Sequence, residues 1–281
     1  MVLVQIVAKS IRKAALLSRT MGERRLPTVF ISHGAPTLML EDIPARKFLK
    51  ELGAKYRRVR AVVCISAHWE TPEPAVNAVG TPDTVHDFYG FPEELYNIDY
   101  PAQGEPRLAE DTADLIRKAG LKCDINRERG LDHGAWVPLM LMSPKADVPV
   151  LQLSIQHHLD PAKHLAVSKT LSGLRDEGIL ILGSGAAVHP LGYSDFYEGK
   201  VTDPWAIAFD DWLTDAVIRG DQDLLVNFRR LSPHPERAHP RPDHFMPILS
   251  ALGAAGDGAR GTALHRSWQY GNFEMGAYSF E

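Results

Sequence analysis

The stretch "FISHGAPTLML", residues 30–40, joins an apolar run to a histidine, a glycine and a proline. The run that leads into it predicts a buried strand over residues 27–32, because short apolar runs bounded by turn residues are typical of a sheet core. The strand then ends at His33. A histidine at such a point either hydrogen-bonds within the turn or presents its ring to a ligand, so the rest of the chain must distinguish the two roles.

Similar apolar runs alternate with helical patterns along the chain, which is the signature of a layered α/β fold. Further strands are predicted at residues 60–67, 75–79, 121–125, 148–155 and 178–183. Four helices are predicted: one capped by Asp42 and ending near Gly53, one over residues 105–119, and one after each of the pairs Asp160-Pro161 and Asp203-Pro204. We therefore expect a single layered α/β domain with a central, mostly parallel or mixed sheet flanked by helices.

Composition and charge favour a small-molecule ligand over a nucleic acid or a membrane. The 281 residues carry 31 Lys and Arg against 35 Asp and Glu, a formal net charge of -4, which does not predict a nucleic-acid partner. No apolar run approaches the ~18 residues of a membrane span, and Cys64 and Cys123 lack the spacing of a metal or redox motif. We expect a cytoplasmic protein that binds a small molecule. The composition is compatible with assembly into a homo-oligomer.

The first residues differ in composition from the rest. Residues 1–25 carry six Lys or Arg against one Glu. We interpret this segment as a basic N-terminal extension, and residues 26–281 as one domain.

Five of the twelve histidines stand at the ends of predicted elements, beside Gly, Pro, Asp or Ser: His33, His68, His133, His189 and His244. Three of them follow predicted strands, whose carboxyl ends form the crevice where α/β proteins bind ligands. Neutral imidazole is a common ligand of borderline metals, and its second nitrogen usually has an outer-shell partner. Asp132 and Asp243 are candidates for that partner. Each histidine taken alone is more often an ordinary hydrogen-bonding residue.

The other histidines carry weaker expectations. At most one of His157 and His158 can face the crevice, since neighbours on an extended segment point opposite ways. His164 is expected to pack on a helix, and His234 and His239, beside prolines, to be exposed. The aromatic residues around His86 either line a pocket for a flat substrate or pack in the core; they are Phe88, Tyr89 and Phe91.

Five motifs then occur in a specific order: SHGAP at 32–36, SAHWE at 66–70, DHGAW at 132–136, GSG at 183–185 before His189, and DHF at 243–245 after an HP pair. Together they resemble the class III extradiol ring-cleavage dioxygenases, which share a LigB-like fold, and in particular the DOPA 4,5-dioxygenase-like branch. The resemblance runs from about residue 27 to the C-terminal residues, and it identifies residues 26–281 as the catalytic domain.

The resemblance implies a non-haem Fe(II) enzyme that inserts O2 into a catechol-type ring, DOPA or a related catechol, and gives a muconic semialdehyde. By motif, His33 and His68 are metal ligands, and His244 stands where protocatechuate-type relatives supply a glutamate. Three neutral imidazoles also suit Zn(II). His189 takes the family's acid/base role or is a fourth ligand in a zinc-loaded form, and His133 is the second active-site histidine.

Two other classes stay open at this point. A zinc hydrolase would use the same histidines to activate water, and a non-enzymatic member of the superfamily would keep the cleft for binding alone. No motif in the sequence indicates which substituents the aromatic diol carries.

Overall fold

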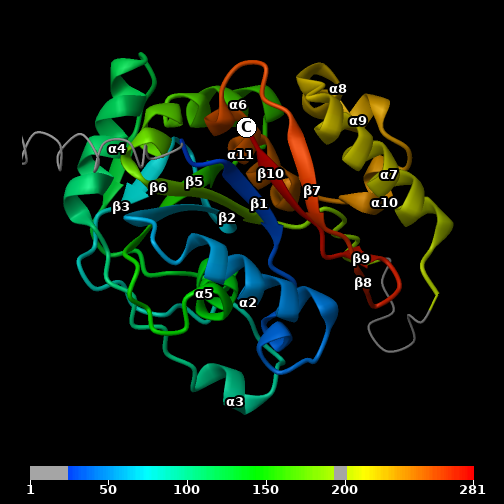
Figure 1. Ribbon diagram of the computed structural model, residues 1–281, viewed down its shortest axis with the longest axis horizontal. Coiled ribbons are helices and arrows are strands. Elements are labelled where there is room, and N and C mark those ends of the chain that lie inside the picture. The colour runs from blue at the N-terminus through cyan, green and yellow to red at the C-terminus, as the bar shows by residue number, and fades with distance from the viewer. Residues whose placement is uncertain (1–24, 193–200) are drawn as a thin grey trace, which may run out of the picture.

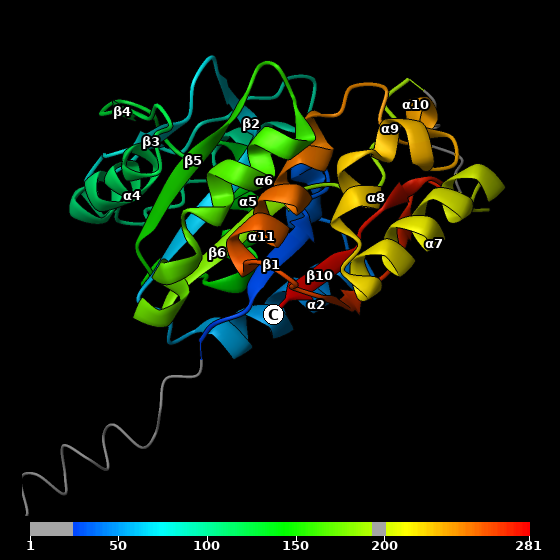
Figure 2. The same cartoon turned by 90° about the horizontal axis from the view of Figure 1, so that it is seen from above.

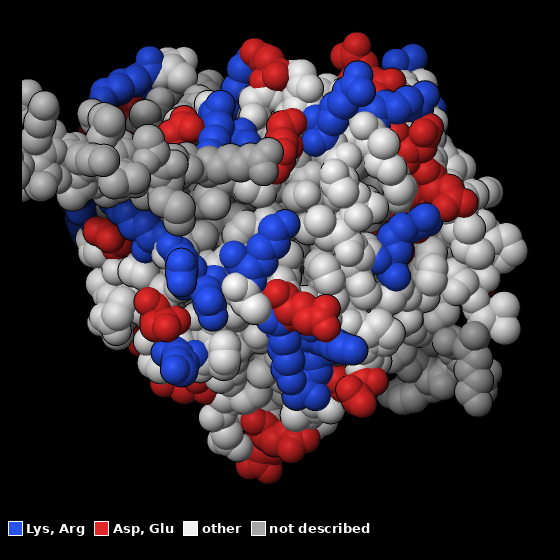
Figure 3. Space-filling view, in the orientation of Figure 1, with Lys and Arg blue, Asp and Glu red and all other residues white. Residues whose placement is uncertain are grey.

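The computed structural model describes residues 25–192 and 201–281 of the chain (Figure 1). The predicted basic extension therefore lies outside the described residues, except for Arg25. No helix in the described ranges is long and apolar enough to cross a membrane. Figure 3 shows acidic and basic side chains interspersed over the face that carries α2 (Pro44–Tyr56), which is typical of a solvated surface.

An eight-stranded mixed sheet forms the centre of the fold, in the order β4-β3-β5-β2-β6-β1-β10-β7. Its four middle strands β5, β2, β6 and β1 run parallel to one another, whereas β10 pairs antiparallel with β1 and β7, and β3 pairs antiparallel with β5. The strands are β1 (Thr28–Ser32), β2 (Ala61–Thr71), β3 (Ala75–Asn77), β4 (Asp124–Asn126), β5 (Val150–Gln156), β6 (Ile179–Gly185), β7 (Gly261–His265) and β10 (Ala277–Phe280); β8 (Trp268–Gln269) pairs with β9 (Phe273–Glu274) separately. The predicted layered α/β domain with a mixed sheet is confirmed.

The central strands are apolar on both faces because helices cover both faces (Figure 2). Along β1, Phe30 faces one core, whereas Val29 and Ile31 face the other. The remaining helices are α3 (Glu93–Tyr96), α4 (Pro106–Lys118), α5 (His133–Met142), α6 (Pro161–Lys169), α7 (Pro204–Arg219), α8 (Gln222–Val226), α9 (Phe228–Leu231), α10 (Pro235–Ala238) and α11 (Met246–Ala255), with 3-10 turns η1 (Pro36–Met39), η2 (Ser172–Glu177) and η3 (Asp243–Phe245).

The four predicted helices are α2, α4, α6 and α7, with one boundary wrong. Helix α2 is not capped by Asp42, because Ile43 holds the N-cap position, and the helix continues through Gly53 to Tyr56. Gly53 does not end the helix. It stands where α2 crosses α5, and a Cβ there would lie 1.9 Å from the carbonyl oxygen of Met142.

His164 on α6 gives the fold a pH dependence. Its Nε2 accepts a hydrogen bond from the Gln156 backbone N–H at 3.0 Å, and its Nδ1 donates to the Asp160 carbonyl at 2.7 Å. The ring is buried, and this burial lowers the pKa of His164 to about 4. Protonation would remove the acceptor that Gln156 uses, so the folded state binds this proton more weakly than the unfolded state, where the pKa is near 6.5.

We expect the stability contributed by His164 to be complete above pH 6.5 and to be lost as the pH falls toward 4. Between pH 7 and pH 5 this one group should lower the free energy of unfolding by about 2 kcal/mol. Urea unfolding of the wild type and His164→Gln at both pH values measures the effect. An equal pH dependence in the two proteins would contradict the assignment.

Candidate metal centre

All five histidines singled out from the sequence line one cavity of about 190 Å³ at the carboxyl ends of the central strands. His33 follows β1 directly, His68 lies within β2, and His189 follows β6. His133 is the first residue of α5, and His244 lies on η3. The other walls are mainly apolar and include Pro36, Phe88, Phe91, Leu191, Phe273 and Met275.

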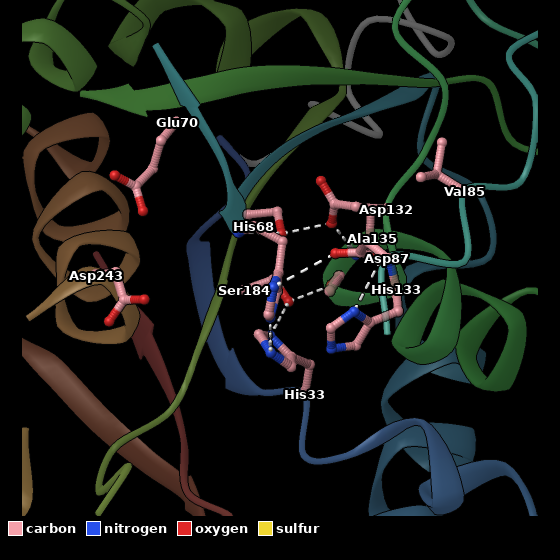
Figure 4. Close-up of polar contacts among 12 residues, drawn as sticks. His33, His68, Glu70, Val85, Asp87, Asp132, His133, Ala135, Ser184 and Asp243 are labelled. Carbon is pink, nitrogen blue, oxygen red and sulfur yellow. Dashed lines mark hydrogen bonds and ion pairs between the residues drawn. The ribbon is translucent and has the colours of Figure 1, made fainter. Parts of the chain in front are cut away.

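Two short contacts between imidazole nitrogens share His68 in this cavity, and His33, His68 and His133 can also offer ligand atoms within 4.8 Å of one another. His68 Nε2 lies 3.1 Å from His33 Nε2 and 3.2 Å from His244 Nε2 (Figure 4 shows the first of these contacts). Nitrogen ligands of a metal ion at ~2.0–2.1 Å lie roughly 2.9–3.4 Å apart in octahedral or tetrahedral geometry. The two observed separations fit such a set.

Two hydrogen bonds through the Ser184 hydroxyl determine which ring nitrogen of His33 carries the proton. The Ser184 hydroxyl donates its hydrogen to the Gly134 carbonyl, so its oxygen accepts the Nδ1–H of His33 at 3.0 Å. Burial first, and then the neighbouring imidazoles, hold the pKa of His33 well below its usual value. His33 is therefore neutral with its Nε2 lone pair directed at His68.

His68 and His244 are neutral for the same reasons. Burial and then the nearby His133 lower the pKa of His68 to about 4, and burial and then His189 lower the pKa of His244. The Nδ1 atoms of both rings face carboxylates: Asp87 Oδ2 lies 3.4 Å from that of His68, and Asp243 Oδ1 lies 3.3 Å from that of His244. All three imidazoles are therefore uncharged at neutral pH, as ligands of a metal ion must be.

His189 lies against this cluster in a different way. Its ring stacks on that of His244 with 3.5 Å between centroids and 7° between planes. A metal ligand directs its lone pair within the plane of its ring, so two closely stacked imidazoles do not both point at one ion. This geometry favours His189 as a neighbour of the metal rather than a fourth ligand.

The expected outer-shell role of Asp132 is wrong. Its carboxylate contacts no imidazole; it accepts hydrogen bonds from Ser66 Oγ at 2.6 Å and Gln152 Nε2 at 2.8 Å, and it caps α5 through the Ala135 N–H at 3.2 Å. The carboxylate on the His133 ring belongs to Asp87 instead, whose Oδ1 lies 2.9 Å from Nδ1. The sequence analysis predicted no role for Asp87, which lies between His86 and Phe88.

The expectation that His239 is exposed is wrong, and the structure separates the two alternatives for the aromatic residues around His86. His239 is fully buried rather than exposed, because its Nε2–H donates to the Ala187 carbonyl at 3.0 Å and its ring packs against phenylalanines. Of the aromatics around His86, Phe88 and Phe91 line the cavity, whereas Tyr89 is exposed. His157 and His158 are both exposed, so neither enters the site.

Arg241 ties two of the converging segments together. Its guanidinium binds both oxygens of Glu70, with Nη2 2.6 Å from Oε2, and Nη1 lies 3.2 Å from Asp243 Oδ2. Glu70 is two residues beyond His68, and Asp243 precedes His244. A bidentate arginine pair has defined geometry, so this contact fixes the separation of the two histidine-bearing segments.

We expect Arg241→Gln to weaken metal binding by less than the ~10–100-fold typical of losing a direct partner of a ligand, because Arg241 bonds Glu70 and Asp243 and not a histidine ring. Titration of the metal-free protein with Zn(II) measures the change. The matched control is Arg219→Gln, which removes a surface ion pair with Asp215 on α7 and should leave the affinity unaltered. Equal affinities for the two variants would show that Arg241 does not position the site.

Comparisons with known proteins identify the family of this chain. Residues 27–280 match the family model described as the catalytic LigB subunit of aromatic ring-opening dioxygenase. The chain is 45% identical over 257 residues to a 4,5-DOPA dioxygenase extradiol of Beta vulgaris, covering 90% of this chain and 96% of that protein. A protein of the same name from Escherichia coli K12 is 37% identical over 238 residues, 83% of this chain and 87% of the relative.

A solved structure shows the same fold. The crystal structure of an uncharacterised protein from Escherichia coli K12 superposes with a TM-score of 0.76 at 31% sequence identity. The match covers 91% of this chain and 99% of that one. The similarity therefore extends over most of this chain.

Proposed function

We infer that this chain, which belongs to the LigB family of aromatic ring-opening dioxygenases, uses Fe(II) and O2 to open a catechol-type ring beside its diol, giving a muconic semialdehyde. The observation that carries the proposal is the convergence of the His33, His68 and His244 Nε2 atoms in an apolar cavity. The names of the relatives support the extradiol class of reaction.

The metal, when bound, would be held by His33, His68 and His244. Ferrous iron supplies the redox chemistry that O2 requires and acidifies a hydroxyl bound to it. The donor set is three neutral nitrogens, which suits Fe(II) and Zn(II) alike. Zinc can therefore occupy the site in purified protein, although it supplies no redox chemistry.

The cavity selects the substrate by shape. A cavity of about 150 Å³ in another protein holds benzene, so about 190 Å³ is adequate for a single ring with small substituents. Phe88, Phe91 and Phe273 offer ring faces and edges against which an aromatic substrate can pack. These walls orient the ring while its hydroxyls face the histidines.

His189 is proposed to move the proton. Burial and then the nearby His239 hold the pKa of His189 well below the usual value, so its ring is unprotonated at neutral pH. Its backbone is fixed by the bond from its N–H to the Ala238 carbonyl at 2.8 Å. A ring nitrogen of His189 can accept the proton of a substrate hydroxyl and return it as the ring opens.

The test is anaerobic reconstitution with Fe(II), followed by oxygen uptake with a panel of catechols and absorption spectra of the products. We expect one O2 consumed per catechol and a yellow semialdehyde, with no uptake by zinc-loaded protein. Ester or amide hydrolysis by zinc-loaded protein without oxygen uptake would indicate a hydrolase instead. Substrate binding without turnover by the iron form would indicate a binding protein.

A further inference from the structure

One carboxylate, that of Asp87, contacts two of the site histidines at once (Figure 4). Its Oδ1 accepts hydrogen bonds from both the backbone N–H of His133, at 2.8 Å, and the ring Nδ1 of His133, at 2.9 Å. Its Oδ2 lies 3.4 Å from Nδ1 of His68. The rings of His68 and His133 lie side by side, with 3.9 Å between their centroids.

The segment that carries Asp87 is held in place by contacts that do not involve the five histidines of the cavity. The Val85 N–H donates to the Leu131 carbonyl at 2.8 Å, and the indole N–H of Trp136 donates to the Val85 carbonyl at 3.0 Å. On the other side, the ring of His86 bonds the Ile98 carbonyl at 3.0 Å. Asp87 is therefore presented to His133 from a fixed backbone.

The hydrogen bond to Asp87 determines which nitrogen of His133 carries a proton, and the second carboxylate oxygen favours the same form of His68. A carboxylate only accepts hydrogen bonds, so the nitrogen that faces it must be the N–H. Nδ1–H is therefore the favoured form of the His133 ring, which Asp87 Oδ1 contacts at 2.9 Å, and the approach of Oδ2 to 3.4 Å favours the same form of His68.

We propose that Asp87 is a positioning residue that fixes His68 and His133 as Nδ1–H tautomers, leaving the Nε2 of each ring free for the metal and the substrate, respectively. This inference rests on the roles proposed above for the two histidines. It explains why the two rings can stand in contact: one carboxylate accepts a hydrogen bond from Nδ1 of His133 and lies 3.4 Å from Nδ1 of His68. The carboxylate acts through the histidines and does not line the cavity.

Asp87→Asn tests the proposal because the amide is nearly the same size but can present its NH2 group to the imidazoles. A donor at that position favours the opposite tautomer, in which Nδ1 is the acceptor. The matched control is Asp99→Asn, which changes an exposed carboxylate that binds only Thr84 among the described residues.

Two measurements follow. Long-range ¹H–¹⁵N spectra of the zinc-loaded protein, with the His133 signals assigned through His133→Gln, should show protonated Nδ1 in the wild type and in Asp99→Asn. They should show loss of that form in Asp87→Asn, together with a metal affinity roughly 10–100-fold weaker. In the iron enzyme we expect kcat to fall by a similar factor, with KM changed less than twofold.

An unchanged tautomer of His133 in Asp87→Asn would overturn the proposal, as would unchanged metal affinity and kcat. Asp87→Glu, which restores a carboxylate, should recover the Nδ1–H signal in part, and a failure to do so would count against it. The spectra and the zinc titration need no turnover. A protein that cleaves no catechol but shows the tautomer change would therefore refute the proposed function and leave the assignment of Asp87 intact.

Discussion

Replacing His68 with alanine is expected to abolish stoichiometric metal binding. His68 Nε2 is the nitrogen shared by the two short contacts of the cluster, to His33 at 3.1 Å and to His244 at 3.2 Å. Removing a direct ligand should cost more than the ~10–100-fold typical of an outer-shell partner. Metal content after dialysis, measured by mass spectrometry, should fall below one tenth of an equivalent, and oxygen uptake should disappear with it.

The control for this variant is His234→Asn, because His234 is exposed, lies outside the cavity and has a left-handed backbone conformation that asparagine tolerates. It should retain a full equivalent of metal. Circular dichroism and thermal unfolding of both variants would show that loss of metal is not loss of fold. One equivalent of metal in folded His68→Ala would refute the proposed ligand set.

The central strands could be predicted from the sequence because their apolar runs match their burial in the sheet. β1, β2 and β6 are parallel strands buried on both faces, so each appears as a continuous apolar run. The residues that follow such runs must lie at the carboxyl edge of the sheet. For this reason the sequence alone indicates His33, His68 and His189 as residues of this edge.

Helices α5 and α11 were not predicted because both are buried on all sides, so their sequences lack the alternation of apolar and polar residues that marks a surface helix. All ten residues of α11 are buried, and nine of the ten in α5 are buried. An all-apolar segment of ten residues has no polar face to reveal a helical period. The short strands β7 to β10 were missed for a different reason: β10 is defined by its antiparallel pairing with β1, almost 250 residues earlier in the chain.

Asp87 shows what a sequence pattern cannot provide. Asp132 is adjacent to His133, and adjacency suggested it as the partner, yet Asp132 serves as the N-cap of α5 and so points along the helix. Asp87 is 46 residues away and meets His133 only in the folded chain. Partners of catalytic side chains are commonly long-range contacts of this kind, without a local signature.

Replacing His189 with alanine is expected to leave the metal bound and to remove most of the turnover. The ring stacks on His244 and therefore does not share the direction in which His244 presents its lone pair. Loss of a general acid/base typically costs 10²–10⁴-fold in rate, and we expect kcat to fall within that range. Oxygen uptake by the iron-reconstituted variant gives kcat, and iron content measured on the same sample gives the occupancy.

The ratio of the two measurements separates the two roles that the sequence left open for His189. An acid/base residue lowers kcat per bound iron while iron content stays near one equivalent, and added imidazole should restore part of the rate by filling the space of the missing ring. A fourth ligand instead lowers metal content and activity together, so that kcat per bound iron stays close to that of the wild type. The stacked geometry predicts the first result, because a ring parallel to His244 at 3.5 Å can receive a substrate proton without directing a lone pair at the same ion.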